Sequence, residues 1–323
     1  MAAGPARGRA KRHPPAESII GMTTVLRWNR PLLFFTAVMA VLAVVAGIGV
    51  LADPRVLTGA PIWLKPFKFA VSFVLYTFTL AWMLSLLPRR SRVAEIAVTV
   101  VLATSVAEIV VIVTQVVRGT TSHYNETTPL NYALFQVMGL AVMLLFLAHF
   151  VLGIVIARQR LTDRVSAHAV RWGLGLSLLG MAVAIPMVQP GQAPAGVDGI
   201  SGAHSVGVAD GGPGLPLVGW STVGGDLRIG HFVGLHALQA LPLLALLLGT
   251  RLDRLTRARL VAVAGCAYGI LTLMLTWQAL RGQPLLEPDG LTLAAWASLA
   301  VTTATATGLV LARRRTPELE LAA

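Results

Sequence analysis

Apolar runs of about twenty residues recur along this chain, and they constrain its fold more than any other feature. A helix needs about twenty apolar residues to cross the hydrocarbon core of a membrane. Only 12% of the residues are charged, whereas soluble domains usually carry about 25%. A soluble fold would also need polar helix faces at a spacing of about 3.6 residues, in place of these runs. The sequence therefore predicts an all-α integral membrane protein, a polytopic bundle of about eight transmembrane helices.

The predicted spans divide the chain into three parts. Residues 1–30 form a basic tail that we expect to be disordered, residues 31–312 form the transmembrane domain, and residues 313–323 form a short second tail. The first apolar run is longer than the 7–15 residues of a signal-peptide core, which favours a retained span. The spans are expected at residues 31–52, 67–87, 93–117, 132–156, 167–188, 229–250, 260–280 and 291–312.

Basic residues alternate between the loops and predict the orientation. Arg residues are concentrated in the N-terminal tail, at 89–92, at 158–164, at 251–259 and at 313–315, while the intervening loops hold most of the acidic residues. Positively charged loops stay in the cytoplasm, so both termini are predicted to be cytoplasmic. Loops 53–66, 118–131, 189–228 and 281–290 are then extracytoplasmic. Of the 26 basic residues only three are Lys, and this bias, with abundant Ala, Gly and Val, favours a bacterial cytoplasmic membrane.

Local signals predict several helix ends and contacts. Thr128 followed by Pro129 is typical of an N-cap and a first helical position, and Asp289-Gly290 precedes the last span. Gly230-x-x-x-Gly234 and Gly265-x-x-x-Gly269 are small-xxx-small patterns that allow helices to approach closely. The last span, rich in Ala and Thr, is predicted to be tightly packed.

Several functional classes are excluded or left without support. The formal net charge of +12 lies in short clusters without interleaved aromatic residues, so nucleic acid is not an expected partner. The single cysteine, Cys266, excludes an intrachain disulfide, a cysteine-based zinc cluster and a CxxC redox pair. No Walker, GxGxxG, GxSxG or HExxH pattern is present. No metal site is predicted, the cofactor and the oligomeric state stay unknown, and the expected partners are the lipid bilayer and a small solute, ion or lipid.

Glu108 is the most informative polar residue of the predicted spans. It lies about ten residues from Arg118, roughly 15 Å inside the outer end of its helix. Thr104, Glu108 and Gln115 share one helix face, which must point into the bundle because a carboxyl group in lipid is costly. A structural glutamate that joins helices is the alternative interpretation.

Other polar residues are predicted at similar depths. His236 and Gln239 share a face of the sixth span, about 12 and 16 Å from its outer end. The sequence predicts one pocket open to the extracytoplasmic side, formed by Glu108, His236, Gln239, His231, Gln115, Gln136 and Gln278. Its mouth is expected at His123, Glu126, Asp226 and Arg228.

Two outer segments have competing interpretations. Lys65 and Lys68 could bind an anionic group, although lysines at a membrane edge usually extend to lipid headgroups. The Gly- and Pro-rich loop 189–228 exceeds ordinary connection lengths, which is typical of lids or disorder.

Haem binding receives little support from the histidines. His231 and His236 lie on one helix about 140° apart, and His149 and His168 lie at different depths of their spans.

Two functional classes remain open. The first is proton- or cation-linked transport of a small solute, with Glu108 and His236 binding and releasing protons or a cation. The alternative is a membrane-embedded enzyme or redox protein acting on a lipid or quinone at the outer leaflet, with Glu108 or His236 as general acid or base.

Overall fold

The computed structural model describes residues 28–159, 161, 163–189, 199–249 and 252–313. Within them, eight helices are long and apolar enough to span a membrane, which confirms the predicted all-α bundle. The predicted basic tail, most of the second tail and the start of the long loop lie outside the described residues. The helices are α2 (Arg30–Ala52), α3 (Leu64–Ser85), α4 (Arg92–Val117), α5 (Pro129–Arg158), α6 (Arg164–Ala182), α7 (Arg228–Leu247), α8 (Arg254–Leu280) and α9 (Gly290–Ala312).

Side-chain caps determine where several helices begin. Thr128 accepts a hydrogen bond from the backbone N–H of Asn131 at 3.2 Å, and Asp289 accepts one from Thr292 at 2.8 Å. These contacts confirm the two predicted helix starts. The α8 helix begins six residues earlier than predicted because Asp253 caps the N–H of Thr256 at 2.9 Å.

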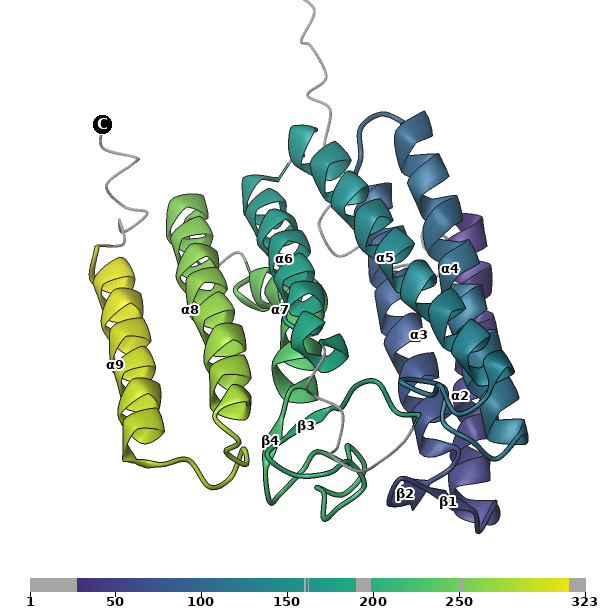
Figure 1. Ribbon diagram of the computed structural model, residues 1–323. Coiled ribbons are helices and arrows are strands. Elements are labelled where there is room, and N and C mark those ends of the chain that lie inside the picture. Colours follow the sequence, from purple (N-terminus) through teal and green to yellow (C-terminus); the bar gives the residue numbers. More distant parts are fainter. Residues whose placement is uncertain (1–27, 160, 162, 190–198, 250–251, 314–323) are drawn as a thin grey trace, which may run out of the picture.

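The short strands all lie at one end of the bundle (Figure 1). Strands β1 (Val56–Leu57) and β2 (Ala60–Pro61) form one antiparallel pair, and β3 (Ser205–Val206) and β4 (Gly225–Asp226) form another. We call this the outer end, because the distribution of basic residues predicts that it faces away from the cytoplasm. A 3-10 turn, η2 (Ile185–Val188), follows α6.

The helices form two groups that lie side by side (Figure 1). In the first group α2 packs on α3 and α4 packs on α5. In the second group α6, α7 and α8 pack on one another, and α9 packs on α8. The groups meet where α5 contacts α6 and α3 contacts α7. We call the region between α3 and α7 the joint.

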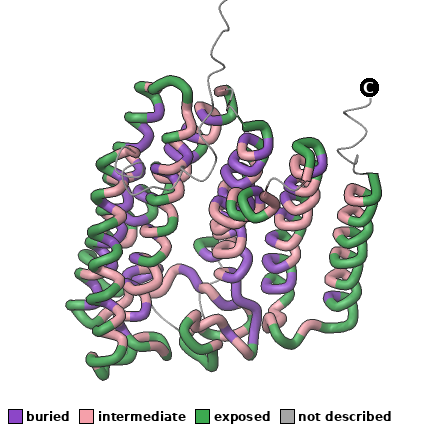
Figure 2. The backbone as a smooth tube through the Cα atoms, turned by 180° about the vertical axis from the view of Figure 1, so that it is seen from behind, coloured by how far each residue is buried: buried purple, intermediate pink, exposed green. Residues whose placement is uncertain are grey.

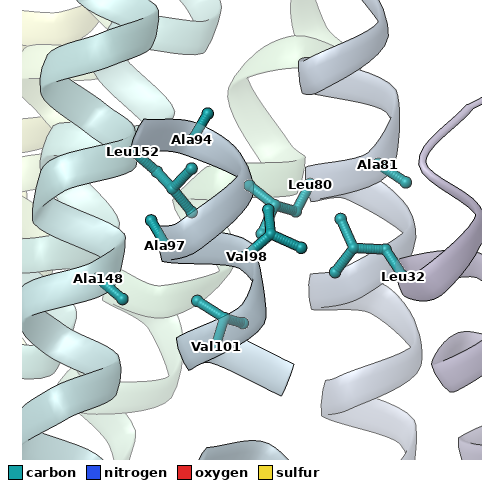
Figure 3. Close-up of a cluster of buried hydrophobic side chains, with 9 residues drawn as sticks. All are labelled: Leu32, Leu80, Ala81, Ala94, Ala97, Val98, Val101, Ala148 and Leu152. Atoms are coloured by element: carbon teal, nitrogen blue, oxygen red, sulfur yellow. The ribbon is translucent and has the colours of Figure 1, made fainter. Parts of the chain in front are cut away.

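Small residues let the helices of the first group approach closely (Figure 3). Alanines on α3, α4 and α5 alternate with larger side chains that fill the space between them. Since lipid is as apolar as these residues, such close packing is what holds helices together in a membrane. The cluster contains Leu32, Leu80, Ala81, Ala94, Ala97, Val98, Val101, Ala148 and Leu152.

Glycines bring α6 and α7 into backbone contact. A Cβ atom on Gly180 would collide with the backbone of Gly234 and Leu235. One on Gly265 would strike the ring of Trp172. These contacts confirm that both small-xxx-small patterns lie at close helix contacts.

The prediction that the last span is tightly packed is wrong. Of the α9 residues only Thr292 is buried, and Figure 2 shows the helix at the edge of the bundle, coloured exposed or intermediate along its length. Its Ala and Thr residues therefore face outward on most sides, because α8 is its main neighbour.

Residues 199–227 fold over the outer end of the bundle. Ser205 pairs with Asp226 in β3 and β4. Gly225 lies against the Ala279 carbonyl at the end of α8, so closely that a Cβ atom would collide with it. Gly214 and Ser221 form a bridge that closes a tight hairpin, and the N–H of Leu215 donates to the Trp220 carbonyl at 2.8 Å. We call residues 213–222 the outer hairpin.

Candidate functional site

A polar face of α3 points toward the joint. Its residues recur every three or four positions and therefore share one side of the helix. All five are half-buried. From the outer end inward they are Lys65, Lys68, Ser72, Tyr76 and Thr79.

The α7 helix reaches this face from the other group. The Gln239 amide donates to the Leu75 carbonyl and to the Thr79 hydroxyl, both at 3.3 Å. The Nδ1 atom of His236 lies 3.3 Å from the amide oxygen of the same Gln239. The polar residues of α7 thus join α3 near the middle of the membrane.

At the same level of α3 a hydrogen-bonded chain joins three helices. The Tyr76 hydroxyl of α3 lies 3.0 Å from Nδ1 of His149 on α5, and Nε2 of His149 lies 2.7 Å from the Ser177 hydroxyl on α6. Ser177 also donates to the Leu174 carbonyl at 2.9 Å. When His149 carries its proton on Nε2, every polar atom of this hydrogen-bonded chain has a partner. No ionised group is needed to complete it.

This chain does not form a hydrolytic triad or a haem ligand set. A serine beside a histidine is typical of nucleophilic catalysis, but the exposed fractions of Ser177 and His149 are 1% and 0%, so no substrate reaches them. Both nitrogens of His149 are engaged in hydrogen bonds, and His168 is exposed, with Nδ1 2.8 Å from the Arg164 carbonyl oxygen. We interpret the chain as a structural link between the two helix groups.

Four ionisable residues of the outer half are half-buried. Lys65, His123, His204 and His231 are enclosed by protein, so that desolvation dominates the environment of each. Each nevertheless keeps accessible surface, and the His204 side chain is 24% exposed. The charges of Lys65, His123 and His204 act on one another, so these three groups are neighbours.

Aromatic contacts hold the two loop histidines in place. The ring of Tyr124 lies 5.1 Å from that of His204 and 6.0 Å from that of His123, both edge to face. His123 also packs on Phe69 of α3 at 5.9 Å. The Ser122 hydroxyl lies 3.1 Å from Nδ1 of His123. The Nε2 atom of His123 has no hydrogen-bond partner among the described residues.

His204 forms a dyad with Asp210. Its Nδ1 atom lies 2.7 Å from the carboxylate, which also accepts the backbone N–H of His204 at 3.0 Å and of Ser205 at 2.8 Å. These donors hold the pKa of Asp210 below its usual range, although burial opposes the shift. Burial lowers the pKa of His204, and Asp210 only partly offsets that effect. Burial, reinforced by the nearby Lys65 charge, lowers the pKa of His123 further. Both imidazoles are therefore neutral at pH 7.

Glu108 lies below these groups without a hydrogen bond. Its exposed fraction is 3%, and neither carboxyl oxygen has a partner among the described residues. The hydroxyl of Ser105, one turn earlier on α4, is also buried and unpaired. Lys65 is the charged group whose field reaches Glu108, and the Lys65 ammonium likewise has no hydrogen-bond acceptor in the described chain. Buried polar groups without partners are rare and call for an explanation.

Two cationic side chains fix the outer hairpin above the joint. Lys68 of α3 donates to the Val218 carbonyl at 2.9 Å, and Arg228 of α7 donates to the next carbonyl, that of Gly219, at 2.6 Å. Arg228 also donates through Nε to Asp226 at 2.9 Å. The Asp226 side chain is fully buried and accepts the N–H of Ser221 at 2.8 Å.

The residues predicted for one pocket lie in several places. His231 lies against α6, with Nδ1 2.7 Å from the Gly180 carbonyl oxygen. Glu108 interacts with Lys65, while His236 and Gln239 lie farther in at the joint. Of the predicted mouth, His123 packs on Phe69 and Tyr124, and Asp226 and Arg228 bind the outer hairpin. Glu126 is exposed on its loop.

The other glutamines serve the outer loops or the outer surface. Gln115 donates to Asn131 at 3.1 Å and accepts from Arg118 at 2.6 Å, which anchors the loop before α5. Gln278 donates to the Pro284 carbonyl at 2.7 Å and accepts from Trp296 of α9 at 3.2 Å. Gln136 is exposed on α5.

Sequence reasoning missed Lys65, Tyr124 and His204 as neighbours of the predicted pocket. The available signal for Lys65 was its spacing from Lys68 in a chain with only three lysines. No local pattern links His204 to helix α3, since 139 positions separate it from Lys65 and the long loop places it there.

Comparison with protein-family models, with curated proteins and with solved structures finds no match to this chain. The fold and the side chains therefore define its class, an eight-helix multi-pass membrane protein with a polar joint between two helix groups.

Proposed function

We propose that this protein transports a small polar solute across a bacterial cytoplasmic membrane, through the joint between its two helix groups, in a cycle linked to protonation of Glu108. The observation that carries the proposal is that Lys65 and Glu108 both lack a hydrogen-bond partner among the described residues. A charged side chain inside a membrane is costly, and such residues mark substrate or ion pathways. A purely structural pair would be expected to share a hydrogen bond, and this pair does not.

The helix arrangement supports movement at the joint. The helices within each group pack through Ala and Gly, whereas α3 and α7 contact one another through polar side chains. In many transporters one helix group rocks against the other around a central site. The polar face of α3 extends from Lys65 to Thr79, past the middle of the membrane, so a moving site would be exposed to either side.

Cysteine accessibility tests this proposal without knowledge of the solute. In a Cys266→Ala background, Ser72→Cys lies on the polar face of α3, and Val71→Cys, one residue away, is exposed on the outer surface of the bundle. We expect impermeant thiol reagents to modify Ser72→Cys from either side of sealed membrane vesicles, and Val71→Cys from neither side. Modification of Ser72→Cys from the outer side alone would show a fixed site and contradict transport.

The His204–Asp210 dyad favours a second candidate, an enzyme acting at the outer leaflet. A carboxylate at Nδ1 orients the ring and leaves Nε2 of a neutral imidazole free to accept a proton, which is the arrangement of a general base. This candidate predicts a fixed outward-open site in the accessibility experiment. It also predicts that His204→Gln abolishes activity on a lipid substrate while leaving the labelling of Ser72→Cys unchanged.

A further inference from the structure

We propose that an anionic phospholipid binds at the inner end of the bundle, with its phosphate held by Arg171 of α6 and Arg158 of α5. The inner end is the end opposite to the short strands, where α5 ends and α6 begins (Figure 1). Because α5 belongs to the first helix group and α6 to the second, the bound headgroup bridges the two groups.

The positive charge of the inner end has no counter-charge among the described residues. The four ion pairs that the described chain forms all lie in the outer loops or at the outer ends of helices. At the inner end Asp163 and Asp253 cap the starts of α6 and α8, and no described arginine there forms an ion pair. An anion that neutralises these arginines must therefore come from outside the described chain.

Arg171 reaches from α6 to the last turn of α5. Its Nη2 atom donates to the carbonyl oxygens of Ala157 and Gln159, at 3.1 and 3.5 Å. The donors on its Nε and Nη1 atoms have no acceptor among the described residues, and the residue is exposed. Guanidinium groups bind phosphate oxygens through such pairs of parallel N–H donors. Two carbonyls thus hold the Arg171 side chain in place, while its remaining donors are open to a phosphate.

Further arginines lie beside this guanidinium group. Arg158 stands between the two residues whose carbonyls Arg171 binds, and it is exposed, with no side-chain hydrogen bond in the described chain. The side-chain amide of Gln159 donates to the Arg89 carbonyl at 3.4 Å, which brings the loop before α4, with the exposed Arg89 and Arg90, to the same place. Like charges this close repel one another, and a bound anion relieves that repulsion.

The position of Arg171 along α6 favours a lipid over a soluble anion. Arg171 lies about 10 Å along the helix from Arg164, within an apolar span, and it is exposed on the surface of the bundle. A charge at such a place is costly unless a partner meets it, and basic sites between helices at a membrane surface are typical of anionic headgroup binding. One turn farther in, Gly175 is exposed on the same face with open space at its Cβ position, so an acyl chain meets no side chain there.

The experiment measures lipid binding by the detergent-purified full chain. The probes are dioctanoyl phosphatidylglycerol, which is anionic, dioctanoyl phosphatidylcholine, which is zwitterionic, glycerol 3-phosphate as a soluble phosphate, and polyglutamate as an acidic polypeptide. Binding raises the thermal unfolding midpoint, which is followed by tryptophan fluorescence. We expect a saturable rise with phosphatidylglycerol that added salt weakens, and no rise with the other three probes at the same concentrations.

Three variants locate the site. Arg171→Gln and Arg158→Gln should each weaken phosphatidylglycerol binding by about 5-fold. Since Arg158 makes no described side-chain hydrogen bond, Arg158→Gln should keep the wild-type midpoint without lipid, and it tests the site even if Arg171→Gln fails to fold. Arg313→Gln is the matched control, because it removes the same charge from an exposed position at the end of α9, on the far edge of the bundle from α5 (Figure 1). It should leave binding unchanged.

Each of several outcomes would overturn the proposal. No binding of phosphatidylglycerol, or equal binding of the two lipids, would show that the arginines hold no headgroup. Equal weakening by Arg313→Gln and Arg171→Gln would show diffuse attraction to a positive end in place of a site. Binding of glycerol 3-phosphate or polyglutamate as tight as that of the lipid would assign these arginines to a soluble anion or to an acidic protein.

Discussion

The contact between α6 and α7 gives a quantitative test of how this bundle is held together. Gly180 faces Gly234 so closely that an added Cβ atom would lie 2.8 Å from the Gly234 Cα and nearer still to two other backbone atoms. Backbone atoms cannot rotate away, so in Gly180→Ala the two helices must separate. Gly175, on the same helix, has open space around its position, and Gly175→Ala is the matched control.

The expected magnitudes follow from two opposing effects. Alanine in place of glycine inside a helix stabilises by about 0.5–1 kcal/mol, and this is the whole effect expected for Gly175→Ala. Overpacking a tight contact costs about 1–3 kcal/mol, and the upper end applies here because the neighbouring atoms are backbone. In Gly180→Ala the hydrogen bond between His231 and the carbonyl of residue 180 would be strained as well. We expect Gly180→Ala to reduce the free energy of unfolding by about 2 kcal/mol.

Unfolding in increasing sodium dodecyl sulfate, followed by the fluorescence of the seven tryptophans, measures the difference between the two variants. Gly180→Ala should unfold at a clearly lower detergent fraction than wild type, and Gly175→Ala at the same fraction or a higher one. Equal stability of the two variants would refute the close α6–α7 approach.

Three further predictions concern the outer end. Asp226→Asn should lower the free energy of unfolding by about 3 kcal/mol, because it leaves Arg228 buried without its carboxylate, and an unchanged unfolding curve would contradict the buried ion pair. Lowering the pH below about 6.5 should destabilise the protein, because His123 and His204 stay neutral when folded but gain protons when unfolded. The unfolding midpoint of His123→Phe should fall less than that of the wild type between pH 7.5 and 5, and an identical fall would count against this cause. In a Cys266→Ala background, cysteine at the exposed position 126 should react with an impermeant reagent on intact cells and cysteine at position 90 should not, whereas the reverse result would invert the topology.

The sequence predicted the membrane-spanning architecture well because hydropathy and helix caps are local properties. Eight apolar runs, Thr128 before Pro129, and Asp289 before α9 each act within a few residues. Boundaries moved where a cap lay outside the apolar run, as Asp253 does for α8. Tight packing of α9 was predicted from small residues alone, although small residues permit close packing and do not require a neighbour.

The polar residues were harder to group because depth does not give the direction in which a side chain points. Gln115, Gln136 and His231 lie in the outer half of the membrane, as their positions imply, yet they face a loop, the outer surface and helix α6, respectively. The contribution of His204 depends on a loop folded over the bundle, and neither periodicity nor composition of residues 199–227 indicates where that loop lies.

The outer hairpin has a mechanical consequence for the two helix groups. Val218 and Gly219 are adjacent, and their carbonyls are held by cations from α3 and from α7. Two consecutive peptide units therefore tie the two groups together, and the distance they span changes little. Separation of α3 from α7 at this end must first break one of these two hydrogen bonds. The outer end therefore has two discrete states, bonded and separated, and does not open gradually. A group that competes for Lys68 or Arg228 would break one of these hydrogen bonds and allow the two helix groups to separate at this end.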